Sequence, residues 1–321
     1  MLTITTPTEL FEDRELDQKW LIKGMIPRNE ISLLFAPHSS YKTFTALAIG
    51  SLIMNLNESL GTVEKRNEEQ EEIKVLYIPT EQTNTIKDRY RALEGRYGDK
   101  LPDVATQKID LTNPESIREL AKTLKYHEYD LVVIDTVSKA IPAGDTANED
   151  LVRRLLTACE LFNECGTAVL LVHHTGHSEL QRPKGSTLWL DNTSAVLTIQ
   201  KTKKGKYHRV LKIVKSKSER EGERIPFVVE VVKVPTSTLW VNFQKEELDD
   251  LSEAIIRQVT KDPIDRNTIR KDIYPTFEDK YASEDSFRKV FNRKVEDLVG
   301  QEKIAIVREN RDVLLVRNED I

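Results

Sequence analysis

The stretch Ile31-Ser-Leu-Leu-Phe-Ala36-Pro-His-Ser-Ser-Tyr41-Lys42-Thr43 decides how the rest of the chain is interpreted. It opens with a short apolar run typical of a buried strand, and a helical pattern begins at its end. A loop between a strand and a helix N-terminus is where backbone N–H groups bind phosphate. The spacing matches G-x-x-x-x-G-K-[ST], with Ala36 and Tyr41 at the two glycine positions. The sequence therefore predicts a phosphate-binding loop that lacks its usual glycines.

We expect this loop to bind ATP together with Mg²⁺. Lys42 would reach the β- and γ-phosphates, and the Thr43 hydroxyl would ligate the metal. Asp135 ends the apolar run Tyr129-Asp-Leu-Val-Val-Ile-Asp135, and an acid at the tip of a buried strand orients Mg²⁺ through water. The alternative is an aspartate that only begins a turn. The residues expected to contact the nucleotide are Ala36, Pro37, His38, Ser39, Ser40, Tyr41, Lys42, Thr43 and Phe44.

Short apolar runs alternate with helical patterns as far as Leu197, which predicts an α/β fold with a parallel sheet. The expected parallel strands are Ile31–Phe35, Val75–Ile78, Leu131–Ile134, Ala168–Val172 and Ala195–Ile199. The expected helices are Thr43–Asn55, Thr83–Tyr97, Pro114–Leu124 and Asn148–Asn163. Antiparallel strands are expected to extend the sheet at Tyr207–Lys215, Phe227–Val232 and Thr238–Phe243. The charged stretch Glu64–Glu72 predicts a solvated loop.

The pattern changes near Glu247, so we expect an ATPase domain over residues 1–247 and a small domain over 248–321. The second domain has the layout of an α+β winged helix, with helices at Ser252–Thr260, Arg266–Ile273 and Glu284–Val299 and strands at Ile304–Arg308 and Val313–Val316. The third helix is apolar on one face and typical of a recognition helix on the other. Its candidate DNA contacts are Arg288, Lys289, Asn292 and Arg293. Acidic residues flank this face, so docking to a protein is the alternative.

Composition favours a globular protein, with 39% hydrophobic and 31% charged residues among 321. The net charge of −5 gives no overall sign of nucleic-acid binding, although a ring can confine its positive charge to a channel. Cys159 and Cys165 lack C-x-x-C spacing and are interpreted as reduced core residues. The polar segment Met1–Asp17 does not have the pattern of a signal peptide, and no apolar run approaches membrane-spanning length. We expect a cytoplasmic protein without a membrane partner.

The order of motifs resembles the AAA_25, or RepA-type, branch of RecA-like hexameric helicases and replication ATPases. The resemblance covers about residues 18 to 220. It is carried by Trp20-Leu-Ile-Lys-Gly-Met-Ile-Pro, the phosphate loop, Glu81 with Arg89 downstream, Val-Val-Ile-Asp135-Thr, and Val172-His173-His174-Thr-Gly176. It implies a RecA-like core that assembles into a ring.

The resemblance also implies a catalytic base. Thr136 occupies the position after Asp135 where many P-loop enzymes have a glutamate, so the base must come from elsewhere. In RecA-like enzymes the strand after the P-loop helix is expected beside the P-loop strand. Glu81, which follows that strand here, is therefore the expected base, and an ordinary turn glutamate is the alternative.

Further roles follow from the same likeness. His174, with His173 beside it, would sense the γ-phosphate; a zinc site is disfavoured because neighbours on a strand point to opposite sides. Gly176–Thr187 would be a loop facing the channel, with Arg182 and Lys184 on nucleic acid, or else a plain surface loop. Lys215 and Lys217 occupy the family's K-x-R positions, which reach the neighbouring subunit's ATP. Lysine supplies charge there but not the bidentate fork of arginine, and two solvated lysines are the alternative.

Two functions remain in play. The first is a ring-forming, nucleic-acid-dependent ATPase, a DNA helicase or translocase of replication type that acts as a homo-oligomer, expected to be a hexamer, on single-stranded or forked DNA. The second is a DNA-binding assembly or regulatory ATPase of a mobile element or defence system that does not unwind DNA. A small-molecule kinase is disfavoured because no acceptor site is evident in the sequence.

Overall fold

The computed structural model of the chain separates into two compact units, Met1–Lys245 and Glu246–Ile321. Each unit is described by itself. The described residues are 19–80, 85–107, 109–141, 144–176, 182–202, 205–218, 220–234, 236–243, 250–260, 262–281, 283–300, 303–309 and 312–317. Among them, no helix is both long enough and apolar enough to cross a membrane.

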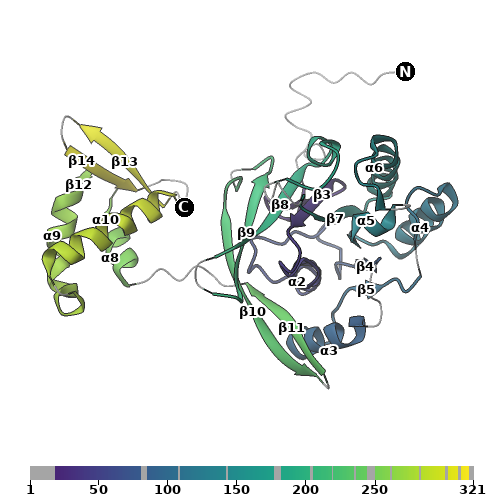
Figure 1. Cartoon of the computed structure of the whole chain (residues 1–321), viewed down its shortest axis with the longest axis horizontal. Helices are drawn as coiled ribbons and strands as arrows, with labels where there is room; N and C mark the ends of the chain where they lie inside the picture. Colours follow the sequence, from purple (N-terminus) through teal and green to yellow (C-terminus); the bar gives the residue numbers. More distant parts are fainter. Residues whose placement is uncertain are drawn as a thin grey trace. The chain divides into compact units, whose positions relative to one another are not determined.

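A nine-stranded mixed sheet forms the centre of the first unit, in the order β11-β10-β9-β8-β3-β7-β6-β4-β5 (Figure 1). Its strands are β3 (Ile31–Ala36), β4 (Val75–Pro79), β5 (Asp103–Val104), β6 (Leu131–Asp135), β7 (Ala168–His174), β8 (Ala195–Lys201), β9 (His208–Lys215), β10 (Arg224–Val234) and β11 (Thr236–Phe243). The strands from β8 to β5 are parallel, and β9, β10 and β11 continue the sheet antiparallel. The central strands are buried on both faces, which is why their sequences are uninterrupted apolar runs.

Helices cover both faces of this sheet. They are α2 (Lys42–Met54), α3 (Ile86–Tyr97), α4 (Pro114–His127), α5 (Val137–Ala140), α6 (Glu149–Glu164) and α7 (Leu188–Asp191). Apolar residues of α2 and α3 share one core cluster with the hairpin of β1 (Trp20–Ile22) and β2 (Ile26–Pro27). Those of α4, α6 and α7 form a second cluster on the other face. The P-loop helix therefore lies on the face opposite to α4 and α6.

The expected strands and helices of the core are present, with ends that differ by a few residues. Glu64–Glu72 contains no helix or strand and is mostly exposed, as its charge predicts. The elements that the sequence did not reveal are short: β1, β2, β5, α5 and α7. Segments of two to four residues carry too little periodicity to be recognised.

One expectation about strand order is wrong. The strand after the P-loop helix, β4, does not lie beside the P-loop strand β3. It pairs with β6 and β5, and both β7 and β6 stand between it and β3. A crossover helix returns the chain in the parallel direction but does not fix how many positions the next strand skips. The strand-neighbour argument for Glu81 therefore loses its geometric basis, although β4 still ends at the same edge of the sheet as β3.

The second unit contains helices α8 (Asp250–Gln258), α9 (Arg266–Phe277) and α10 (Glu284–Gly300), with a short 3-10 helix at Glu278–Lys280. A three-stranded antiparallel sheet in the order β12-β14-β13 completes it. The strands are β12 (Ile264–Asp265), β13 (Ile304–Glu309) and β14 (Asp312–Arg317). Ile255, Phe287, Phe291 and Leu315 are buried at its centre. The expected helices and hairpin are thus present, and β12 is an additional strand.

Candidate nucleotide site

The loop between β3 and α2 has the shape of a phosphate-binding loop even though its glycine positions are substituted. Ser39 and Tyr41 adopt left-handed backbone conformations, with φ of 58° and 67°. No side chain caps the N-terminus of α2, and its first turn contains no acidic residue. The first N–H groups of a helix lack intrahelical partners and attract an anion. The helix start is therefore suited to a phosphate.

Lys42 is directed into this loop. Its ammonium group donates to the carbonyl oxygens of Ala36 and Pro37 at 2.9 and 2.8 Å, and its side chain is buried. These two carbonyl groups hold the ammonium group at the centre of the loop. A phosphate bound in the loop would lie within reach of this ammonium group.

Asp135 lies at the end of β6. It is next to the phosphate loop, as the sequence predicts. Its carboxylate accepts a 2.7 Å hydrogen bond from the Tyr77 hydroxyl and a further one from the Thr43 side chain. Burial raises the pKa of Asp135, and the two hydrogen bonds and the nearby cations Arg89 and Lys42 act in the opposite direction. The Thr43 hydroxyl and the Asp135 carboxylate thus meet as two oxygen donors. Hard oxygen ligands are what Mg²⁺ prefers, so these residues fit the ion.

The ends of β4 and β6 are tied together at the same edge. The Thr80 hydroxyl accepts from the Thr136 N–H at 2.6 Å and donates to the Thr136 carbonyl at 2.8 Å. The Thr80 N–H donates to the Asp135 carbonyl at 2.7 Å. Glu81, the expected base, follows Thr80 directly but lies outside the described residues.

The two histidines at the end of β7 have different partners. His173 is fully buried, and its Nε2 donates to the Lys184 carbonyl at 2.8 Å. His174 stacks on His38 of the phosphate loop, with ring centroids 4.2 Å apart. Burial lowers the pKa of His173 to about 4 and that of His174 to about 3. Both rings are therefore neutral at physiological pH, and only His174 contacts the phosphate loop.

The loop after β7 is anchored at its base. Thr175 pairs with Pro183, and the Lys184 N–H donates to the His174 carbonyl at 2.8 Å. Gly185 has a φ of 94° and packs so closely on the Thr146 carbonyl that a methyl group at this position would overlap it. The predicted nucleic-acid contacts Arg182 and Lys184 are exposed beside this base. Residues 177–181 lie outside the described part of the chain.

Lys215 and Lys217 lie at the opposite edge of the sheet from the phosphate loop. Lys215 donates to the Leu190 carbonyl at 2.8 Å, and Lys217 lies 3.7 Å from a carboxylate oxygen of Glu30. Glu30 directly precedes β3, whereas the phosphate loop follows it. The structure therefore does not bring these two lysines together with Lys42 and Asp135 of the same chain.

The structure adds contacts for Arg209 and Tyr77, which the motifs did not identify, and for Arg89, which the motif order includes. The Arg209 guanidinium lies 5.0 Å from the ring centroid of Tyr41, and that of Arg89 lies 5.0 Å from the ring centroid of Phe44. Tyr77, in β4, reaches Asp135 as described above. A buried tyrosine in an apolar strand does signal that its hydroxyl needs a partner, but the sequence does not name that partner.

The predicted DNA contacts of the second unit lie along α10. Arg288, Lys289 and Arg293 are exposed and Asn292 is half-buried. Arg288 and Lys289 both pair with Asp285, at 2.5 and 3.4 Å. An acidic side chain thus offsets part of the positive charge of this face.

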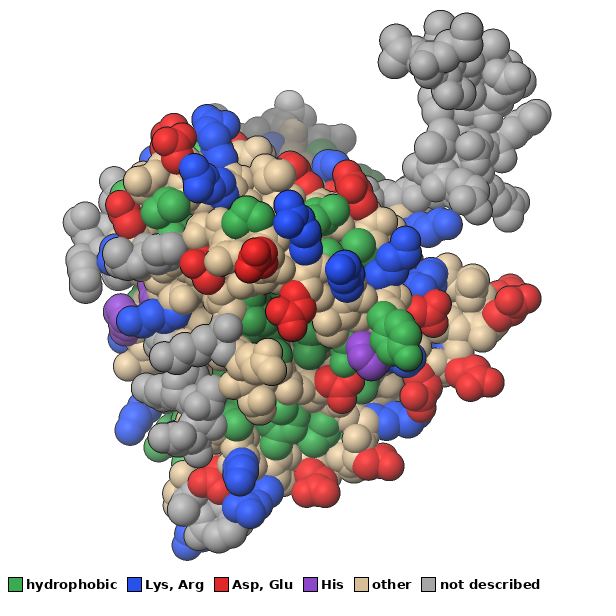
Figure 2. All heavy atoms as spheres, turned by 90° about the vertical axis from the view of Figure 1, so that its right-hand side faces the viewer, with side chains coloured by type: hydrophobic (Ala, Val, Ile, Leu, Met, Phe, Trp, Pro, Cys, Tyr) green, Lys and Arg blue, Asp and Glu red, His purple; other side chains and the backbone are tan. Residues whose placement is uncertain are grey.

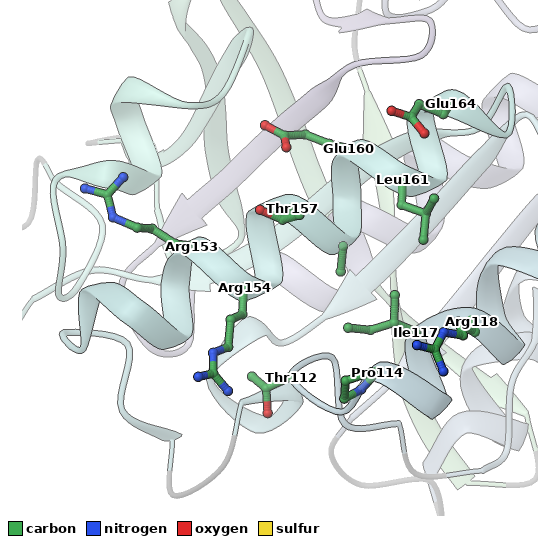
Figure 3. A pocket seen from close by; sticks show the side chains of 11 residues that line it. Thr112, Pro114, Ile117, Arg118, Arg153, Arg154, Thr157, Glu160, Leu161 and Glu164 are labelled. Atoms are coloured by element: carbon green, nitrogen blue, oxygen red, sulfur yellow. The ribbon is translucent and has the colours of Figure 1, made fainter.

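A groove of about 640 Å³ lies between α4 and α6 (Figure 3). Ile117 and Leu161 contribute apolar surface to it, and Arg118, Arg153 and Arg154 surround it. It belongs to the face of the sheet opposite to the P-loop helix, so it is no part of the phosphate site. On the molecular face shown in Figure 2, basic and acidic side chains are interspersed.

Phosphate chemistry explains why a lysine, a threonine and a buried acid converge at one edge of this sheet, and the arrangement defines a P-loop ATPase of the RecA type. A family model described as "AAA domain" (AAA_25) matches residues 3–179. Since the match spans more than half of the chain, the chain belongs to the AAA_25 family.

Two further comparisons complete the findings. The chain is similar to a solved structure described as the RadB recombinase, with 17% sequence identity and a TM-score of 0.46. The similar region covers 64% of this chain and 89% of that chain. Among curated proteins, none matches the chain.

Proposed function

We propose that this protein is a ring-forming, nucleic-acid-dependent ATPase, a DNA helicase or translocase of replication type. The observation that carries the proposal is the position of Lys215 and Lys217. They lie at the edge of the sheet opposite to their own phosphate loop, next to Glu30 and Leu190. Cations placed there suit the ATP site of a neighbouring copy, as an arginine finger does. A closed ring, which we expect to be a hexamer, would give every subunit such a neighbour.

Within one subunit, Lys42 binds the phosphates and the helix start of α2 supplies its N–H groups. Thr43 and Asp135 would hold Mg²⁺, which would supply charge neutralisation for the phosphates. Glu81 orients the attacking water. Its predecessor Thr80 is fixed to the end of β6, at the same edge of the sheet as the phosphate loop.

The loop that follows β7 contacts nucleic acid through Arg182 and Lys184. Its base is hydrogen-bonded to His173, and the neighbouring His174 stacks on His38 of the phosphate loop. A change at the γ-phosphate therefore has a short covalent and hydrogen-bonded route to the DNA-contacting loop. This route supports a motor in which hydrolysis moves the loop.

The second unit is proposed to be a winged helix that holds single-stranded or forked DNA through Arg288, Lys289, Asn292 and Arg293. Three helices followed by a β-hairpin support this interpretation. The contacts with Asp285 favour an alternative for the whole protein, an assembly or regulatory ATPase in which this unit docks on a protein and nothing is unwound.

Steady-state ATP hydrolysis with and without single-stranded DNA tests the motor. We expect single-stranded DNA to stimulate hydrolysis by the wild-type protein. This stimulation should be lost in Lys42→Ala and Glu81→Gln. Slow turnover that is indifferent to DNA would favour the regulatory ATPase instead. Displacement of a labelled strand from a forked duplex then separates the two functions, since an assembled protein that hydrolyses ATP without displacing the strand is not a helicase.

A mixing experiment tests the shared site. Lys42→Ala subunits lack a working phosphate loop, and Lys215→Ala/Lys217→Ala subunits lack the cations offered to a neighbour. Each variant alone should be inactive, whereas mixed rings contain interfaces with both parts intact and should recover part of the hydrolysis. If mixed assemblies recover none, the two lysines do not act across the interface.

A further inference from the structure

Tyr41 occupies a position where a P-loop ordinarily has glycine. It adopts a left-handed conformation, with φ of 67° and ψ of 25°, immediately before α2 begins at Lys42. This conformation brings Cβ close to backbone atoms in any residue other than glycine, so the loop needs another source of stabilisation. No side-chain hydrogen bond caps the helix at this residue.

Arg209 provides a contact that could supply this stabilisation. Its guanidinium carbon lies 5.0 Å from the Tyr41 ring centroid, within the range of a cation–π interaction. Only 5% of Arg209 is exposed, and the interaction is strongest when the cation is removed from water. The aromatic side chain of residue 41 therefore packs against the core cluster on this face of the sheet and against Arg209 of β9.

The arginine is itself fixed in place. Its Nη1 donates to the carbonyl oxygens of Lys206 and His208, both at 2.7 Å. The backbone of Arg209 is paired on both sides, with Lys201 of β8 and Phe227 of β10. A group held by its own strand and by two neighbouring strands gives the Tyr41 ring a rigid support.

We propose that Tyr41 and Arg209 form a clamp that holds the phosphate loop in its binding conformation and replaces the second glycine of the motif. Arg209 is a positioning residue that acts on the nucleotide through Tyr41. The inference rests on the proposed binding of ATP at this loop, and it assigns that site a support from β9.

The test is a double-mutant cycle at residues 41 and 209 in the full chain, with binding of a fluorescent ATP analogue and Mg²⁺ as the readout. Arg209→Ala should weaken binding about threefold to thirtyfold, the range that corresponds to one buried cation–π contact. In a Tyr41→Gly background the loop no longer needs the clamp, so Arg209→Ala should have no further effect. The KM for ATP should rise by a similar factor, and kcat should change less.

Conservative variants separate positioning from general damage. Tyr41→Phe keeps the ring and should keep the dependence on Arg209, and Arg209→Lys should retain part of the affinity. Tyr41→Leu removes the aromatic ring that contacts Arg209 but leaves β9 unchanged. It therefore serves as a second test of the clamp if Arg209→Ala does not fold. Arg224→Ala, which replaces an exposed arginine at the start of β10, is the matched control.

Two outcomes would overturn the clamp. Equal losses from Arg209→Ala in the wild-type and Tyr41→Gly backgrounds would mean that Arg209 acts independently of Tyr41. Unchanged binding in both Arg209→Ala and Tyr41→Leu would mean that the stack has no role. Failure of the proposed function looks different, because the wild-type protein would then bind the analogue no better than Lys42→Ala.

Discussion

His173 and Lys184 are joined by a 2.8 Å hydrogen bond from the histidine Nε2 to the lysine carbonyl oxygen. The bond fixes the imidazole tautomer, because only the protonated nitrogen can donate to a carbonyl. The Lys184 N–H is engaged as well, with the His174 carbonyl. Both backbone polar groups of Lys184 are thus bound to the end of β7. The side chain of Lys184 starts from a fixed point at the base of the loop proposed to contact DNA.

Protonation of His173 should couple stability to pH. Its pKa is lowered to about 4 when folded, against about 6.5 when unfolded. Between these values the unfolded chain binds a proton that the folded chain does not, so stability falls as pH decreases through this window. From pH 7 to pH 5 the contribution lost is about 2 kcal/mol. His173→Gln, which can still donate to Lys184, should reduce the difference between urea unfolding free energies measured at the two pH values.

The control for this experiment is His127→Gln, which changes an exposed histidine in the last turn of α4. It should leave the pH dependence as in the wild type. A His173→Gln protein with the full wild-type slope would show that His173 is not the titrating group.

Loss of the Lys42 ammonium should remove nucleotide binding. The group is buried at the centre of the phosphate loop, and a charge-assisted hydrogen bond contributes about 1.5–3 kcal/mol. Lys42→Ala should therefore weaken binding of a fluorescent ATP analogue at least about tenfold and abolish hydrolysis. Lys122→Ala, which replaces an exposed lysine on α4, is the matched control. Wild-type affinity in Lys42→Ala would exclude this loop as the phosphate site.

Removal of the Tyr77 hydroxyl should shift the pH profile of hydrolysis. The hydroxyl donates to Asp135, whose pKa burial already raises. In Tyr77→Phe the carboxylate loses this donor and its pKa rises further. The acid limb of the activity profile should therefore move upward by about one to two pH units, since a hydrogen bond to a charge corresponds to about that shift. More Mg²⁺ should also be needed for half-maximal rate.

Tyr90→Phe is the matched control for Tyr77→Phe. The Tyr90 hydroxyl is buried on α3 and has no hydrogen-bond partner among the described residues. Its removal should leave the acid limb in place. An acid limb that moves equally in both variants would point to a general change in the core and not to Asp135.

Asp130 should be a major determinant of stability. Its side chain is fully buried, and it accepts hydrogen bonds from Arg28 Nη1 at 2.8 Å, Gln70 at 2.7 Å and the Lys74 N–H at 3.0 Å. Asp130→Ala would leave the Arg28 cation buried without this carboxylate, which costs about 3–5 kcal/mol. Urea denaturation measures the loss. Asp88→Ala breaks an exposed pair with Arg91 and should cost less than about 1 kcal/mol; equal losses would contradict the special role of Asp130.

Much of the fold can be predicted from the sequence because its strands are buried on both faces. The run Leu131–Ile134, for example, contains no polar residue that would obscure its apolar pattern. The Lys42-Thr43 pair follows the first apolar run, Ile31–Phe35, after a short loop. The expected ATP and Mg²⁺ ligands Lys42, Thr43 and Asp135 do lie together. Local patterns suffice for them because each is placed by the strand or helix that carries it.

The remainder depends on contacts between distant parts of the chain. Tyr77 and Asp135 are 58 residues apart and meet only because β4 and β6 are neighbours. The position of β4 away from β3 cannot be read from motif order, since crossovers of similar length skip different numbers of strands. The partners of Asp130 come partly from the charged stretch Glu64–Glu72, in which Gln70 is indistinguishable from its solvated neighbours in the sequence.

The strand β9 carries a cation at each end. Arg209, near its start, lies against the phosphate loop, and Lys215, at its end, lies at the opposite edge of the sheet. At about 3.4 Å per residue the two are roughly 20 Å apart. If adjacent copies share their ATP sites, this single strand is a rigid spacer between two consecutive nucleotides in the ring. Its length would then contribute to the distance between successive sites, and a one-residue deletion within it would shift Lys215 relative to Arg209.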